Sequence, residues 1–343
     1  MKTFFIIALI ILLSNLIFSN FLRAEDENSK IIISKIKIEG LQAISTDRIK
    51  DSMATEFPSI KPWAKKSEFD ERTLKDDVLR IKDLLGNSGY YSSKVDYNLK
   101  FNNNKTSVEI LIKIDEGDPV ILDELNIVIP KGYDTDIEKN IIQSIPIKVN
   151  DVFSVFNYEK SKTVINQLLA DKGYPKPDVK GEASISRKDK AAKATFQIDP
   201  GEKYTFGEIV IKGFSDIDVK LIRREITYNE GSQFNLKDIS DSQENIFKLS
   251  FFKSVIIDTE FDDENLKVKT IYTLRERKLR TVRVGVGAGT EDILRGQISF
   301  NQRNFLGGAR SLEIGTKVSF ITQNLQAILK QPYFFSRDNE LRA

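Results

Sequence analysis

A pattern of strand, helix, helix, strand, strand repeats three times along this chain, and no other feature of the sequence constrains the fold as strongly. Three segments that alternate apolar and polar residues, as a half-buried strand does, open the repeats: 34–40 (SKIKIEG), 122–129 (LDELNIVI) and 206–213 (FGEIVIKG). A longer helix with one apolar face follows in each repeat, and in the first its apolar positions are Leu74, Val78, Ile81 and Leu85. The chain is therefore expected to fold as tandem α+β units.

The long helix of the first two repeats is expected to end in the same way. The sequences LLGNSGYYSSKV and LLADKGYPKPDV place Gly89 and Gly173 84 residues apart, and a tyrosine follows each glycine, Tyr90 or Tyr174. Glycine adopts the left-handed conformation at a helix C-terminus without a Cβ clash, so both glycines are predicted to close their helices in that conformation. The third repeat has Ser250 here and is expected to close its helix in some other way.

Two strands joined by a polar turn complete each repeat. The predicted turns are residues 102–105, 187–190 and 262–265. The acidic third turn lacks the spacing and the glycine of an EF-hand loop, so a metal site is disfavoured. Only a few residues separate one repeat from the next, which favours a semi-rigid string of domains over freely tumbling ones.

The composition argues against most hydrolytic mechanisms. The chain has no Cys and no His, so it lacks thiol nucleophiles, imidazole bases and the usual zinc ligands. With 52 Lys and Arg against 50 Asp and Glu, the net charge of +2 gives no electrostatic reason to expect a nucleic-acid partner. An enzyme that uses two carboxylates is a distant alternative, because no motif brings such a pair together, and we predict no catalytic residue.

Residues 1–24 are expected to be a secretory signal peptide. Lys2 precedes an apolar run over 4–13, and a cleavage site is expected after Ala24. Leu22 is bulky for its position three residues before the cut, so an uncleaved membrane anchor is the alternative. The rest of the chain is expected to be exported in either case.

From Val282 onwards, strict alternation replaces helical periodicity. Leu294, Ile298 and Phe300 fall on one face of a predicted strand, whereas the opposite face has Arg295, Gln297, Asn301 and Arg303. Such segments suit a transmembrane barrel, and a soluble sheet with one wet face is the alternative. Roughly four strands follow, fewer than the about eight that a closed barrel needs, so we expect the sequence to be part of a longer protein.

Together these features resemble the POTRA domains of the BamA/TamA superfamily of outer-membrane assembly and secretion factors. The helix exits GYY and GYP and the junctions DEGDPVILDELNI and DPGEKYTFGEIVIKG resemble POTRA motifs, while VGVGAGT, RNFLGGARSL and QPYFF resemble the first strands of the barrel that follows. The resemblance implies an α+β chain of three tandem POTRA (βααββ) domains followed by the start of a transmembrane antiparallel β-barrel. Its expected boundaries are 31–119, 120–203, 204–279 and 280–343.

Three repeats between a signal peptide and a barrel most resemble the TamA branch, the outer-membrane subunit of the translocation and assembly module. BamA relatives usually have more repeats, and two-partner secretion transporters have fewer. The resemblance implies an outer-membrane protein with periplasmic POTRA domains, and its expected partners are unfolded β-barrel or autotransporter clients, an inner-membrane TamB-like subunit and outer-membrane lipid. It implies no cofactor. In such a barrel, the polar face of the strand would place Arg295, Gln297, Asn301 and Arg303 toward the lumen.

The resemblance also implies where clients bind. The first strand of each hairpin, over 94–101, 179–185 and 255–261, would lie at a sheet edge and accept a client strand by β-augmentation. The candidate residues on these edges are Lys94, Val95, Val179, Lys180, Glu182, Val255 and Ile257. One alternative for these edges is that they only pack against the next repeat. Two alternatives for the whole protein also stay open: a docking scaffold held by an uncleaved anchor, and a two-partner secretion transporter.

Overall fold

The computed structural model describes residues 31–59, 61, 63–133, 135–215, 217–289, 294–332 and 339–343. The predicted signal peptide and most of the QPYFF motif lie outside these residues. The chain divides into two compact units, which are described separately. The first contains residues up to 126 with 145–161 and 181–195, and the second contains 127–144, 162–180 and 196–343. Among the described residues, no helix is both long and apolar enough to cross a membrane.

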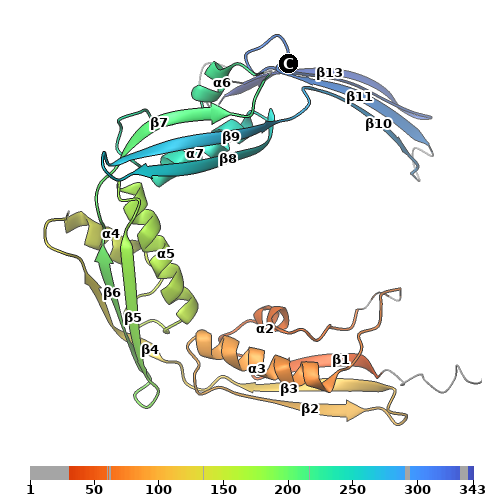
Figure 1. Cartoon of the computed structure of the whole chain (residues 1–343). Coiled ribbons are helices and arrows are strands. Elements are labelled where there is room, and N and C mark those ends of the chain that lie inside the picture. The colour runs from red at the N-terminus through yellow and green to blue at the C-terminus, as the bar shows by residue number, and fades with distance from the viewer. Residues whose placement is uncertain are drawn as a thin grey trace, which may run out of the picture. The chain divides into compact units, whose positions relative to one another are not determined.

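The first repeat consists of β1 (Ile32–Glu39), α2 (Thr46–Ser52), α3 (Glu71–Asn87), β2 (Lys94–Phe101) and β3 (Ser107–Asp115) (Figure 1). Its sheet has the order β1-β3-β2, with β1 parallel and β2 antiparallel to β3. The side chain of Asp70 accepts hydrogen bonds from the first N–H groups of α3 and so begins that helix. Burial of Leu74, Ile81 and Leu85 against the sheet contributes roughly 1.5–3 kcal/mol for each side chain.

One polar side chain lies in this apolar face. Asp77 is fully buried, and its carboxylate accepts hydrogen bonds from the backbone N–H groups of Ala54 (2.7 Å) and Thr55 (2.8 Å). Arg80 donates to the same carboxylate at 2.6 Å. Burial alone would raise the pKa of Asp77, but these hydrogen bonds outweigh it and hold the pKa below its ordinary value. Asp77 therefore fixes the segment that leaves α2.

The second repeat has the same element order. It consists of β4 (Ile121–Val128), α4 (Thr135–Ser144), α5 (Val155–Asp171), β5 (Asp178–Ser186) and β6 (Ala191–Asp199), with the sheet order β4-β6-β5. Its residues are divided between the two compact units.

The third repeat consists of β7 (Thr205–Lys212), α6 (Val219–Arg223), α7 (Leu236–Lys248), β8 (Phe252–Asp262) and β9 (Lys267–Glu276), in the sheet order β7-β9-β8. Aromatic side chains dominate its core, where the rings of Phe206 and Tyr228 stack with centroids 3.6 Å apart. The hydroxyl groups of Tyr228 and Tyr272 lie 2.7 Å apart, so these buried polar atoms are hydrogen-bonded. The fold is thus three βααββ repeats, as the sequence predicts.

The prediction for the end of the third long helix was wrong. Ser250 has a φ of +62°, so it adopts the same left-handed conformation as the glycines of the first two repeats. A residue with a side chain accepts this conformation at a cost of roughly 1–2 kcal/mol, provided that its surroundings leave room for the Cβ atom. Ser250 is exposed and lines a cavity, which explains why a side chain fits there.

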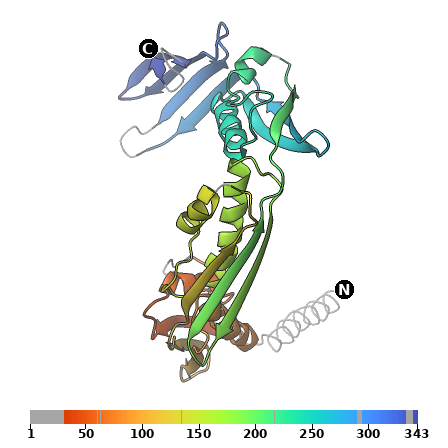
Figure 2. The same ribbon diagram turned by 90° about the vertical axis from the view of Figure 1, so that its left-hand side faces the viewer.

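The C-terminal segment forms a five-stranded antiparallel meander in the described residues. Its strands are β10 (Arg280–Gly287), β11 (Arg295–Arg303), β12 (Ser311–Ser319), β13 (Gln323–Pro332) and β14 (Glu340–Arg342), which pair in sequence order. Neighbouring strands run side by side in one curved sheet (Figures 1 and 2).

The register of this sheet separates apolar from polar side chains. Val284 pairs with Ile298, and Phe300 pairs with Ile314, so apolar residues of adjacent strands share one face. That face is open: Val284 is 74% exposed, and Leu325 on β13 is 79% exposed. A soluble domain would normally cover an apolar surface of this kind, so the face is suited to contact an apolar surrounding.

Candidate client edges and interdomain joints

The exit of α3 joins the first repeat to the second. Gly89 has a φ of +102°, and its C=O accepts a hydrogen bond from the N–H of Val120, the residue before β4, at 2.9 Å. A Cβ atom at Gly89 would lie 2.5 Å from Cγ1 of Val152 and 2.7 Å from the carbonyl oxygen of Phe153. Glycine is therefore required here for close approach as well as for its conformation. We call these four residues the first joint.

The exit of α5 forms the second joint in the same way. Gly173 has a φ of +97°, and its C=O accepts from the N–H of Tyr204, which precedes β7, at 2.9 Å. A Cβ atom at Gly173 would meet the side chain of Gln233, with Nε2 at 2.8 Å. That same Nε2 donates to the C=O of Lys172 at 2.7 Å. The obstacle at the second joint is thus a flexible side chain instead of backbone.

The segment between the two prolines that follow Gly173 is held by the third repeat. Lys176 forms an ion pair with Asp263, which lies in the turn between β8 and β9. The hydroxyl of Tyr204 donates to the same carboxylate at 2.7 Å, and the ammonium of Lys176 lies 4.7 Å from the ring centroid of Phe261. Hydrogen bonds from Lys176 and Tyr204 hold the pKa of Asp263 below its ordinary value. The repeated helix exit is therefore a joint between domains.

The predicted client edges all lie on outer strands. Strands β2, β5 and β8 each stand at the margin of a three-stranded sheet, with one neighbour among the described strands. These strands contain every predicted edge residue: Lys94, Val95, Val179, Lys180, Glu182, Val255 and Ile257. A marginal strand presents a row of N–H and C=O groups that an added strand can pair with.

The edge of β8 differs from the expectation in two places. The C=O of Val255 accepts a hydrogen bond from the side chain of Gln243 on α7 at 2.7 Å, and the Val255 side chain is buried. Phe261, near the end of β8, contacts Tyr204 of the second joint and also Lys176. Ile256 is 53% exposed between these points. The hydrogen bond from Gln243 to Val255 could not be predicted from the sequence, because it depends on how α7 packs.

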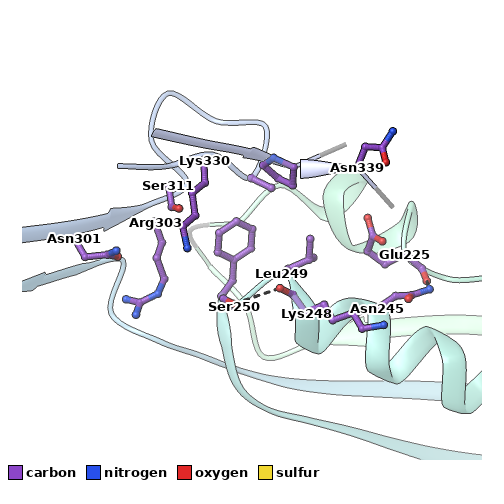
Figure 3. Close-up of a pocket in the computed structure, with 13 residues that line it drawn as sticks. Glu225, Asn245, Lys248, Leu249, Ser250, Asn301, Arg303, Ser311, Lys330 and Asn339 are labelled. Carbon is purple, nitrogen blue, oxygen red and sulfur yellow. Dashed lines mark hydrogen bonds between the residues drawn. The ribbon is translucent and has the colours of Figure 1, made fainter. Parts of the chain in front are cut away.

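The polar residues of β11 lie along one face of the sheet, and two of them line a cavity of about 550 Å³ (Figure 3). Asn301 and Arg303 reach it from β11, while Lys248 and Ser250 reach it from the end of α7. Arg303 Nη1 donates to the C=O of Lys278 at 3.1 Å. Asn301 and Arg303 are thus brought together with the third repeat, whereas Gln297 lies along β11 in a second cavity of about 330 Å³.

Within the described part of the chain, no group of three or more acidic side chains is placed to hold a metal ion. The joints and edges consist mainly of backbone groups and packed apolar side chains. What this geometry offers chemically is hydrogen bonding to another strand.

Tandem βααββ repeats followed by an antiparallel sheet define a class of repeat protein, and a family comparison identifies it. Residues 31–117, 128–201 and 204–277 match the POTRA family model, described as the surface antigen variable number repeat. The chain therefore belongs to the POTRA family.

Two curated relatives are outer membrane protein assembly factors named BamA. The chain is 25% identical over 324 residues to BamA of Buchnera aphidicola, which covers 93% of this chain and 52% of that protein. It is 23% identical over 317 residues to BamA of Neisseria meningitidis, covering 90% of this chain and 39% of that protein. The chain thus spans about half or less of the length of these relatives.

A solved structure shares the fold. BamA from Haemophilus ducreyi lacking POTRA domains 1–3 matches with a TM-score of 0.53 and 22% identity, over 65% of this chain and 42% of that one. This likeness supports the architecture of repeats followed by a sheet.

Proposed function

We propose that the chain is the POTRA-bearing part of an Omp85-type outer-membrane assembly or translocation factor. It is an outer-membrane protein with its POTRA domains in the periplasm, in line with the family and the named relatives. The observation that supports the function best is that β2, β5 and β8 occupy the same marginal position in three successive sheets. An unfolded β-barrel or autotransporter client adds a strand to one of these edges, with affinity coming from main-chain hydrogen bonds.

The C-terminal sheet is the beginning of the barrel that receives the client. The alternation of its two faces supports this role, because the apolar face with Val284 and Leu325 suits lipid. Arg295, Gln297, Asn301 and Arg303 then face the lumen. A Lys or Arg on the lipid face would cost roughly 2–4 kcal/mol at mid-membrane, which favours this orientation over its reverse.

A TamA-type role is the finer proposal, and a BamA-type role is its competitor. Three matched repeats support the TamA-type role, whereas the names of the relatives favour the BamA-type role. A TamA-type protein pairs with an inner-membrane TamB-like subunit, so co-purification with such a subunit supports the first role and its absence supports the second. Mass spectrometry of the mature N-terminus tests the anchored-scaffold alternative, which requires residues 1–24 to be retained.

Site-specific photocrosslinking tests the client edges. A photoreactive residue at Glu182 on β5 or at Ile256 on β8 should capture an unfolded outer-membrane client in the full chain. The matched control is Leu79, which is 60% exposed on α3 and lies on no strand edge. Equal capture at Leu79 and at the two strand positions would show that clients bind by non-specific apolar contact, and the proposed function would fail.

A further inference from the structure

The first repeat has the same docking geometry as the repeats that receive a helix exit. In the first joint, the N–H of Phe153 donates to the C=O of Val120 at 2.8 Å, and Val152 forms an isolated bridge with Ile121. The second joint repeats this arrangement, because the N–H of Phe234 donates to the C=O of Tyr204 at 2.9 Å. In each case, the segment between the two helices and the start of the first strand together receive the preceding glycine.

The equivalent positions in the first repeat are Ile31, Ile32, Glu68 and Phe69. The N–H of Phe69 donates to the C=O of Ile31 at 2.7 Å, and Ile32 forms an isolated bridge with Glu68. The backbone is therefore set up as it is in the two joints. Because two copies of this geometry bind a helix end within the same chain, the third copy has a defined kind of ligand.

A hollow of about 500 Å³ lies beside these residues. It is lined by Ile32, Ile33 and Ser67, together with three exposed lysines, Lys61, Lys65 and Lys66. The C-terminal end of a helix bears a partial negative charge, and nearby cations stabilise it by roughly 0.3–1 kcal/mol each. The charge around the hollow therefore matches the end of the helix that the joints bind.

The segment that presents these lysines is longer than its counterparts. It connects α2 to α3 over residues 53–70, whereas the corresponding connections cover 145–154 and 224–235. Both ends are fixed, by the buried carboxylate of Asp77 and by the hydrogen bond from the N–H of Ile33 to the C=O of Ser67 (2.8 Å). Trp63 is 82% exposed between these ends. Long connections of this kind are uncommon within a compact domain, and they are usually either functional or linker segments.

We propose that Ile31, Ile32, Glu68 and Phe69 with the three lysines form a socket, the first-repeat socket, for the C-terminal helix end of a partner protein. The partner helix ends in a left-handed glycine followed by an aromatic residue, as α3 and α5 do. Its terminal C=O accepts from the backbone of the socket, and the lysines face its negative end. This goes beyond the proposed client edges, because the ligand is a folded helix end and not an extended strand.

Trp63 gives a direct test, since it is the only tryptophan of the chain. The probe is a tryptophan-free peptide with the sequence of residues 71–92, the α3 exit, held helical by a lactam bridge. Added to the full chain in detergent, it should shift the Trp63 emission saturably. A peptide with Gly89→Val should bind at least about tenfold more weakly, because valine resists the left-handed exit.

Charge reversal separates a specific socket from general adhesion. The double variant Lys65→Glu/Lys66→Glu should weaken binding of the probe at least about fivefold, whereas Lys82→Glu, an exposed lysine of α3 outside the hollow, should not change it. Circular dichroism confirms that the variants are folded. Absence of a saturable shift, equal binding of the two peptides, or binding only after removal of residues 1–30 would each overturn the proposal. The last outcome would mean that the chain fills the socket itself.

Discussion

Alanine at the two joint glycines should have different consequences, because the atoms that oppose the new Cβ differ. Each substitution incurs roughly 1–2 kcal/mol for the left-handed conformation. At Gly89, the Cβ atom also meets the backbone oxygen of Phe153 at 2.7 Å, and overpacking of this kind costs roughly 1–3 kcal/mol. At Gly173 the opposing group is Gln233, which can swing away and lose a hydrogen bond of about 1 kcal/mol.

A background substitution makes the difference measurable. In a Gln233→Ala background, Gly173→Ala should cost only the conformational ~1–2 kcal/mol. In a Val152→Ala background, Gly89→Ala should still cost about 3 kcal/mol, because the backbone obstacle is still present. Hydrogen exchange of the amides of Val120 and Tyr204, which donate to the two glycines, reports each joint separately, and each tenfold change corresponds to about 1.4 kcal/mol. Full relief of the Gly89→Ala effect by Val152→Ala would refute the reasoning.

Three further predictions concern the core, the edge and the sheet. Because the pKa of Asp77 is lowered in the folded state, the stability that its carboxylate contributes is fully present above the unfolded pKa of about 3.9 and is lost as the pH falls through the folded pKa. Asp77→Asn should destabilise the first repeat by about 1–3 kcal/mol at pH 7. In urea titrations at different pH values, it should also flatten the loss of stability at acid pH. Lys180→Pro or Glu182→Pro should block client crosslinking at β5 where the replaced N–H points outward, while alanine at the same positions should do much less, with circular dichroism unchanged. Cysteine at Ile298 should react with lipid-soluble probes and cysteine at Asn301 with water-soluble ones in the membrane-embedded complete protein, and the reverse pattern would exclude the proposed orientation.

The repeat architecture could be predicted because its signals are local. The spacing of Leu74, Ile81 and Leu85 places these residues on one face of α3, and all three are buried. The alternation around Ile298 likewise follows from the two-residue period of a strand. Each of these patterns depends only on neighbours along the chain, so no knowledge of tertiary contacts was needed.

The parts that could not be predicted depend on contacts between distant segments. Asp77 lies within the apolar face of α3, and its partners Ala54 and Thr55 are brought to it only by packing. Ser250 adopts a left-handed conformation that is unfavourable for a residue with a side chain, and it does so because a cavity leaves room for that side chain. The docking role of Gly89 does have a counterpart in the sequence, because its donor Val120 and the equivalent Tyr204 are 84 residues apart, as the two glycines are.

The second joint and the edge strand β5 are continuous in the chain, and this continuity links architecture to the proposed function. Gly173 binds the third repeat through its C=O, Lys176 binds Asp263 of that repeat, and β5 begins two residues later at Asp178. An edge whose entry is already ordered loses less conformational freedom when a client strand pairs with it, so more of the main-chain hydrogen-bond energy is left for affinity. The joint therefore has two effects: it fixes one repeat to the next, and it presents the following strand in an ordered state at the sheet margin.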